Sequence, residues 1–595
     1  MEWVESLKNN ENLRKCLLLL EKHSKVLSSL YAVLLVFIYG VVSYMELSVC
    51  HIQSRHILET NGFYMYLYGI SSIYLLYLIC IVNVAKKTMN EITCCSKRFR
   101  VFDGSESHGK FPVRFIMVLF GLGTVGHFVL DPGLVRMFSD EIPDDCRDNT
   151  RKPQYIINIV LAIIYTILQV IVVVMFPRLT IKCHKVLNSL GTKHIIATNM
   201  ILWLGSLINE STEKIHDKTH KLEQNVTNNE KINYTFCSEH NLMKICDDPP
   251  SLKDYRDVRM YLYAFAIEFA LMGALVFMGM TFQFDQPPAV SVASRKLSTR
   301  PRINSFIRTN DCKSSGVGLM LGILILATVI ASLCVFHTGL TCPELDGNAT
   351  KIGMENCEKD WPQICPEINT HVYSTAVNLI GSMLIICGII SIHKHSNDSN
   401  LRKSVNHGTS FDFDKVLLCI GAGCSILFSL LTILTGTYGL NREYYSCKYP
   451  VAALLAFSGM IEMIQIISQI LFLLVLRKRF FLYTEQSFKP GRQYVMFSFV
   501  FNLSQWIFLT AQVQKPSATT IQAVFFGYSP WVIIKRILLP LAIFYRFHSS
   551  VMSIELWKAA YQNARKIHKE PSVTEQIPQM GSKKVKDTLI NSVFY

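Results

Sequence analysis

Apolar stretches of about 20 residues recur along the whole chain, separated by shorter polar segments. A helix of that length crosses the hydrocarbon core of a bilayer. The pattern predicts an all-α polytopic membrane protein with twelve transmembrane helices. Their expected cores are 27–50, 62–85, 112–131, 154–177, 192–209, 259–282, 316–338, 370–393, 413–436, 450–476, 492–513 and 524–557.

Composition supports this class. Half of the 595 residues are hydrophobic and only 17% are charged, whereas a soluble domain carries about a quarter. The formal charge of +15 comes from short basic loops beside the spans, so it does not indicate nucleic-acid binding. The first 25 residues are polar, so no cleavable signal peptide is expected and the first span would act as its own insertion signal.

The distribution of basic residues predicts the orientation. With a cytoplasmic N-terminus, about 35 Lys and Arg fall inside and about 17 outside, as the positive-inside rule expects. Both termini are therefore predicted to be cytoplasmic, in a multi-pass protein of the plasma membrane. The glycosylation triplets in predicted outer loops begin at Asn225, Asn233 and Asn348.

Cysteines also cluster in predicted outer loops, where disulfides can form. They are Cys146, Cys237, Cys246, Cys342, Cys357, Cys365 and Cys447. Cys237 with Cys246, and two of the three between 342 and 365, are candidate pairs. The connectivity stays open, because spacing alone does not determine it.

Loop composition divides the chain into two six-helix halves. The Pro- and Ser/Arg-rich segment between them suits a flexible linker. The expected parts are a cytoplasmic N-terminus (1–26), a first half (27–282) with a long outer loop (211–258), a cytoplasmic linker (283–315), a second half (316–557) and a cytoplasmic tail (558–595).

The two halves repeat a polar pattern. Consecutive spans place a Gln, an Asn and a Tyr in each half, and each Asn precedes a Trp by four residues. The two sets are Gln169, Asn199 and Tyr263, and Gln469, Asn502 and Tyr545, with Gln465 as a second glutamine. Six spans separate the copies, which predicts a parallel repeat. The alternative is that these amides only join helices by hydrogen bonds.

Several ionisable residues fall at predicted membrane depth, where charge is costly and often functional. Glu268 and Glu462 each lie about two turns from an outer end, and Glu462 forms a polar stripe with the two nearby glutamines. Burial raises the pKa of a carboxyl group in general, which suits proton exchange. Packing of a neutral or paired acid is the alternative.

The last span and the third span add further candidates. Arg546, His548 and Glu555 interrupt the apolar segment 540–557, and they could also reach headgroup water from a helix end. His127 and Asp131 are four residues apart near the outer end of the third span and could interact directly.

Three histidines of the long outer loop titrate near neutral pH and are candidates for sensing acid or zinc. They are His216, His220 and His240. A solvated loop is the ordinary interpretation. The sequence has no phosphate-binding loop, dinucleotide motif or zinc-protease motif, so no catalytic site, resident metal or cofactor is expected.

Specific segments resemble the otopetrins, a family of proton-selective channels. They are His194 to Trp203, Tyr261 to Phe269, Glu462 to Phe472, Gly491 to Trp506 and Pro540 to Ser550. The likeness reaches across most of the membrane region but not the loops or termini.

The resemblance implies a homodimer and proton entry activated by extracellular acid, with zinc as an inhibitor and membrane lipids, including a sterol, as partners. The family's buried acids would fall on Glu268 and Glu462. A Gln-Asn-Tyr constriction would fall on Gln469 or Gln465 with Asn502 and Tyr545, and its counterpart on Gln169, Asn199 and Tyr263. Arg546 and His548 match the terminal-span motif.

Two other functions fit parts of the pattern. A proton-coupled transporter of a small solute would share twelve spans and a repeat, but would favour a pair of Gly/Pro-interrupted helices. An integral-membrane acyltransferase could use His548 and Asn502 as a buried catalytic pair. The otopetrin-like segments and the two acids favour the channel.

Overall fold

The computed structural model describes most of the helical part of the chain. The described residues are 11–48, 56–87, 91–94, 97–100, 111–131, 134, 152–175, 184–226, 250–284, 315–338, 361–394, 401–403, 413–440, 449–477, 479–481, 491–513 and 520–560. The loop His240, the sequons Asn233 and Asn348, and six of the seven predicted outer cysteines lie outside them, whereas the backbone of Cys365 is in the first turns of the helix that begins at Trp361. So does most of the linker 283–315 and of the tail 558–595.

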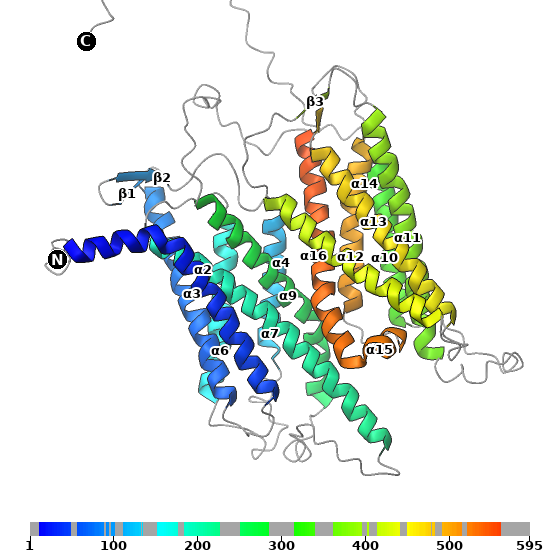
Figure 1. Ribbon diagram of the computed structural model, residues 1–595, viewed down its shortest axis with the longest axis horizontal. Helices are drawn as coiled ribbons and strands as arrows, with labels where there is room; N and C mark the ends of the chain where they lie inside the picture. Colours follow the sequence, from blue (N-terminus) through cyan, green and yellow to red (C-terminus); the bar gives the residue numbers. More distant parts are fainter. Residues whose placement is uncertain are drawn as a thin grey trace, which may run out of the picture.

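Long helices run up and down in alternation (Figure 1). The first set is α2 (Glu11–Ser48), α3 (His56–Lys87), α4 (Phe111–Val129), α6 (Lys152–Met175), α7 (Lys185–Val226) and α9 (Pro250–Phe284). The second set is α10 (Gly316–Thr338), α11 (Trp361–Lys394), α12 (Phe413–Leu440), α13 (Tyr449–Arg477), α14 (Arg492–Val513) and α16 (Tyr528–Ala560), with the short α15 (Thr520–Phe526) before the last.

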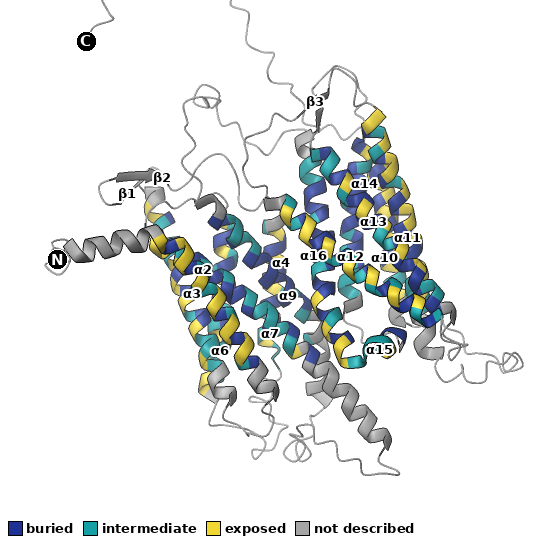
Figure 2. Cartoon of the chain, in the orientation of Figure 1, coloured by how far each residue is buried: buried dark blue, intermediate teal, exposed yellow. Residues whose placement is uncertain are grey.

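The outer surface of the bundle is apolar. On α2, Val26, Leu30, Val33 and Phe37 are 64–71% exposed and follow one helical face, and Figure 2 shows exposed residues along the outward helices. Ten described helices are long and apolar enough to span a bilayer. Because large apolar side chains face outward along helices of that length, the chain is a multi-pass membrane protein.

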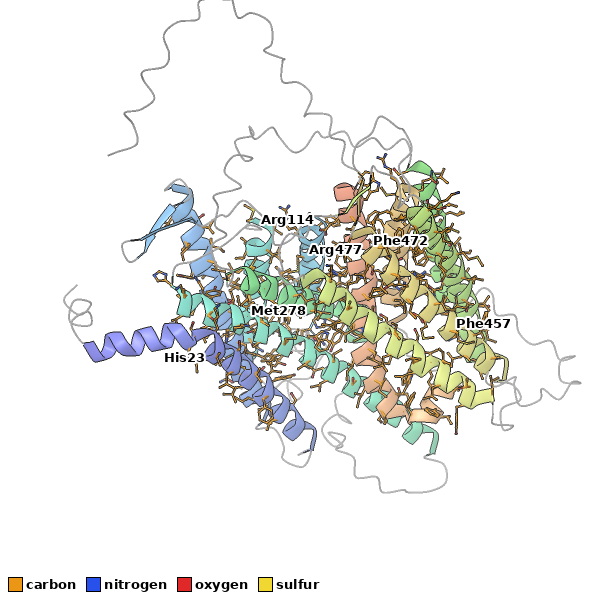
Figure 3. All side chains as sticks on the ribbon, turned by 45° about the horizontal axis from the view of Figure 1, so that its top comes forward. His23, Arg114, Met278, Phe457, Phe472 and Arg477 are labelled. Carbon is orange, nitrogen blue, oxygen red and sulfur yellow. The ribbon has the colours of Figure 1, made fainter. Side chains whose placement is uncertain are left out.

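The prediction of twelve spans therefore has direct support for ten. The apolar part of α4 is shorter, Arg114–Val129, and α7 is not among the ten candidate spans in the part of the chain that the structure describes. Arg114 and Arg477 lie at the same end of the bundle (Figure 3), which is the end where α4 begins and α13 finishes.

The two sets share one packing scheme. In the first set α2 packs on α7, α3 on α6, α4 on both α6 and α9, and α7 on α9. In the second set α10 packs on α14, α11 on α13, α12 on both α13 and α16, and α14 on α16. Each pair in one set thus has a counterpart at the same ordinal place in the other.

Helix α16 joins the two sets. It contacts α7 and α9 as well as its own neighbours. Phe544, Phe547 and Val551 of α16 belong to the apolar core of the first set, where Trp506 also packs. The rings of Phe120, Trp506 and Phe547 lie 6.0–6.5 Å apart, so aromatic contacts fill the boundary.

The predicted outer loop 211–258 is shorter in the structure, because α7 continues to Val226 and α9 begins at Pro250. The sequence explains the extension: Glu210 and Asp217 each precede a lysine by four residues, a spacing that stabilises a helix. Likewise, α2 begins at Glu11, inside the predicted N-terminal segment.

Four short strands were not predicted. β1 (Glu91–Cys94) and β2 (Lys97–Arg100) form an antiparallel hairpin, and β3 (Leu401–Lys403) pairs with β4 (Arg479–Phe481). The second pair ties the connection after α11 to the connection after α13. These strands lie in polar connections, so the helical class of the protein is unchanged.

Candidate functional site

Helix α9 carries four polar or close-packed positions through the first set, three of them on one face, whereas Glu268 lies about 140° around the helix from its two neighbours in this series. From its beginning these are Arg259, Tyr263, Glu268 and the close-packed Gly273. At 1.5 Å per residue these positions extend about 20 Å along the helix, much of the thickness of a bilayer core. Arg259, Tyr263 and Gly273 each meet polar side chains from α4, α6 or α7, whereas Glu268 is itself a buried polar group.

An arginine-centred cluster lies at the first of these positions. The Nη2 atom of Arg259 is 2.7 Å from Asp131 Oδ2 and 3.5 Å from His127 Nε2. The hydroxyl of Tyr155 donates a hydrogen bond to Asp131 Oδ1. The sequence predicted that His127 and Asp131 could interact directly, and the structure joins them through Arg259.

Tyr263 lies next along the helix. Its ring is 5.1 Å from the ring of His127, in an edge-on arrangement. Its hydroxyl donates to the backbone carbonyl of Ser206 on α7. Ser206 is seven residues beyond Asn199, about 10 Å along α7. Tyr263 therefore lies nearer to the arginine cluster than to the predicted amide group of Gln169 and Asn199.

Glu268 is the buried acid of the first set. It is only 3% exposed. Neither of its carboxyl oxygens has a hydrogen-bond partner among the described residues. A buried polar group without a partner is costly, so this position calls for a mobile partner such as water or a proton.

The amides of Gln169 and Asn199 meet against Gly273. Both side chains are fully buried, and none of their four polar atoms has a partner in the described part of the chain. A Cβ at Gly273 would lie 3.0 Å from both polar atoms of Asn199 and closer still to Gln169 Nε2. Tyr165, one turn before Gln169, lies beside Asn199 without a hydrogen bond of normal geometry.

The second set holds a bonded version of this amide group. Gln469 Nε2 donates to Ser498 Oγ at 2.8 Å, and Asn502 Nδ2 donates to the Ser498 carbonyl at 2.7 Å. Ser498 Oγ is also 3.0 Å from Ser553 Oγ on α16. Only the amide oxygens of Gln469 and Asn502 are left without partners within the described residues.

A buried guanidinium lies on α16 beside this group. Arg546 is 2% exposed and donates to Gln465 Oε1. Its guanidinium carbon is 5.7 Å from the ring centre of Tyr545, whose hydroxyl donates to the Ile466 carbonyl at 3.2 Å. Glu462 lies within electrostatic range of Arg546 but forms no direct ion pair with it.

The two predicted acids differ in setting. Glu462 is only half-buried, whereas Glu268 is buried. They also lie on helices that do not correspond, because α9 has the packing partners of α16 and not those of α13. The two acids therefore share a similar depth within their helices but do not occupy corresponding helices of the two sets.

The remaining candidates lie on α16, in the extension of α7, or outside the residues that the structure describes. The ring of His548 stacks on Phe544 at 5.6 Å, and Glu555 lies two turns further along α16. The backbone of His216, His220 and Asn225 is in the extension of α7. Within the residues that the structure describes, no group of three metal-ligating side chains occurs.

Sequence reasoning missed Arg259, Tyr165, Gly273 and Ser498. Tyr165 precedes Gln169 by four residues and so shares its helical face, a signal that was available. Arg259 was included in a span without a role. Gly273 and Ser498 become informative only through contacts between helices.

Comparison with known proteins identifies relatives. The model of the Otopetrin family matches residues 113–236 and 217–547. The Drosophila melanogaster protein named Proton channel OtopLc is 26% identical over 401 residues. That match covers 64% of this chain and 23% of the relative, so the chain matches about a quarter of that protein's length.

Proposed function

This chain belongs to the otopetrin family, and on that premise we propose that it is a proton-selective channel that conducts H⁺ into the cell when the extracellular side is acid. The name of the Drosophila relative supports proton conduction. The observation that carries the proposal is the series of polar positions along α9, where Glu268 is a buried carboxyl without a partner and Gly273 adjoins buried amides without partners among the described residues.

These groups along α9 would provide steps for a proton. The outer groups would be His127, Asp131 and Arg259, followed by Tyr263 and then Glu268. Carboxyl and imidazole groups with water between them form proton relays in membranes. Unpartnered amides such as those of Gln169 and Asn199 can hold water in a narrow polar site, because each buried water needs two to four polar contacts.

A corresponding seam would exist in the second set. Its narrow part would comprise Gln469 or Gln465, Asn502 and Tyr545, with Glu462, Arg546 and His548 nearby. Three loop histidines, His216, His220 and His240, would tune activation by acid and inhibition by zinc. We propose no enzymatic activity for this chain.

The proposed architecture is twelve spans in two related halves, 27–282 and 316–557. Matching helix pairs in the two sets support a parallel repeat, and α4 and α7 would complete the twelve. The excess of basic residues at one end supports cytoplasmic termini in the plasma membrane, together with a cytoplasmic linker 283–315 and tail 558–595. Family membership supports a homodimer in contact with membrane lipids, including sterol.

Whole-cell recording tests the function. Extracellular pH is stepped from neutral to acid while sodium and potassium are replaced by a large impermeant cation. We expect an inward current whose reversal potential moves by about 59 mV per unit of pH difference. A current that needs an added solute would instead support a proton-coupled transporter, and no current with protein at the surface would contradict both the selectivity and the acid activation.

A further inference from the structure

The two amide groups are at corresponding places but differ in their hydrogen bonds. In the first set the four polar atoms of Gln169 and Asn199 have no partner in the described chain. In the second set the nitrogen of each corresponding amide, Gln469 and Asn502, donates to Ser498. Buried amides without hydrogen-bond partners favour binding of water, whereas amides that are hydrogen-bonded to a neighbouring helix hold the two helices together.

A glycine makes room for the first group. Gly273 lets both amides lie directly against the backbone of α9, since a single methyl group there would come within 3.0 Å of Asn199 and displace Gln169. The amides thus occupy space that any other residue would take. The missing side chain of Gly273 therefore leaves the space that the Gln169 amide fills.

A fixed charge distinguishes the second group. An arginine keeps its positive charge at physiological pH, and Arg546 is buried beside Gln465 without a direct ion pair to Glu462. A positive group in a narrow polar path is an electrostatic barrier to cations. In the described part of the first set no arginine or lysine contacts the amides of Gln169 and Asn199, whose polar atoms have no partner.

We propose that protons cross through the seam of the first set, at the narrow site against Gly273, and that the guanidinium of Arg546 bars the second seam to cations. This inference rests on the proposed proton-channel function. It assigns Gly273 and Arg546 as the residues that decide which half conducts.

The first experiment adds one methyl group in each half. Gly273→Ala should lower the acid-evoked current at least about tenfold, with the amount of surface protein measured by biotinylation. Gly381→Ala is the matched control, because its new methyl group would also be crowded, but only by the ring of Phe501. It should keep the current per surface molecule within about twofold.

The second experiment removes the barrier. In the Gly273→Ala background, Arg546→Gln should restore proton current at least about threefold, whereas the charged Arg546→Lys should restore none. Arg546→Met is the second neutral variant if the glutamine variant fails to reach the surface. Asn199→Val gives a second way to close the first seam if Gly273→Ala misfolds.

The outcomes separate the two proposals. If the wild-type chain conducts no protons, the proposed function fails. If the wild type conducts and Gly273→Ala conducts equally well at equal surface amounts, the function stands and the assignment to the first set is overturned. If Arg546→Gln reaches the surface and restores nothing, the assignment of Arg546 as the barrier is overturned.

Discussion

Gln169 and Gln469 offer a paired test of whether the buried amides hold helices together or line a wet path. Substitution by Met keeps length and volume but removes both polar atoms. Gln169 has no hydrogen-bond partner among described residues, and an unpaired buried amide costs about 1–3 kcal/mol. Gln169→Met should therefore leave the protein as stable or raise its stability by up to that amount.

Gln469 is the control, because it donates a 2.8 Å hydrogen bond to Ser498. Hydrogen bonds between helices in membranes contribute about 0.6 kcal/mol on average and up to about 1.7 kcal/mol. Gln469→Met should lower stability by an amount in that range. The two substitutions are thus expected to move the thermal midpoint in opposite directions, or at least unequally.

Thermal unfolding of purified protein at one fixed scan rate measures the difference, since large proteins often unfold irreversibly. Proton current is recorded in parallel. Loss of current with retained stability in Gln169→Met would mark a functional amide. A fall in stability equal to that of Gln469→Met would refute the reasoning, because it would show that Gln169 makes a hydrogen bond of ordinary strength.

Three further predictions concern single sites. Glu268→Gln, which is neutral and of the same shape, should lower proton current about tenfold at unchanged surface level; an unchanged current removes Glu268 from the path. The Arg259–Asp131 pair, with side chains 27% and 15% exposed, should show a coupling of about 1–2 kcal/mol in a double-mutant cycle of Arg259→Gln and Asp131→Asn, measured by thermal unfolding; additive effects would contradict a direct ion pair. Gly527 has φ +83°, so Gly527→Ala should destabilise the turn before α16 by about 1–2 kcal/mol, and an unshifted thermal midpoint would show that this turn relaxes freely.

Apolar run length was sufficient to predict where most helices lie, because a span must bury its backbone and present apolar side chains to lipid. It was insufficient at α7, where Asn199 and the charged residues after Ser206 lower the apolar content although the helix continues to Val226. The spacing of Glu210 and Asp217 four residues before lysines favours a helix there, and a hydropathy average does not register such spacing.

The candidate site was predictable only as far as single helices reach. The four-residue spacing of His127 and Asp131 correctly placed them near one another, but the bridging Arg259 comes from a helix more than 120 residues away. Glu268 and Glu462 lie at a similar predicted depth but on helices with different packing partners, because depth along a span does not specify which helix of the repeat carries a residue. Such pairings depend on tertiary packing, and one sequence does not encode them in its spacing.

The position of α16 has a consequence for how the chain is made. Phe544, Phe547 and Val551 complete the apolar core of the first helix set, yet they are added only after more than 540 residues of the chain have been synthesised. Domains usually fold in order of synthesis, but here the first six helices complete their apolar core only with residues of the last helix. Truncation before α16 should therefore destabilise the first half as well as the second. The six helices that lack α16 are the state that a chaperone of the membrane insertion machinery would bind.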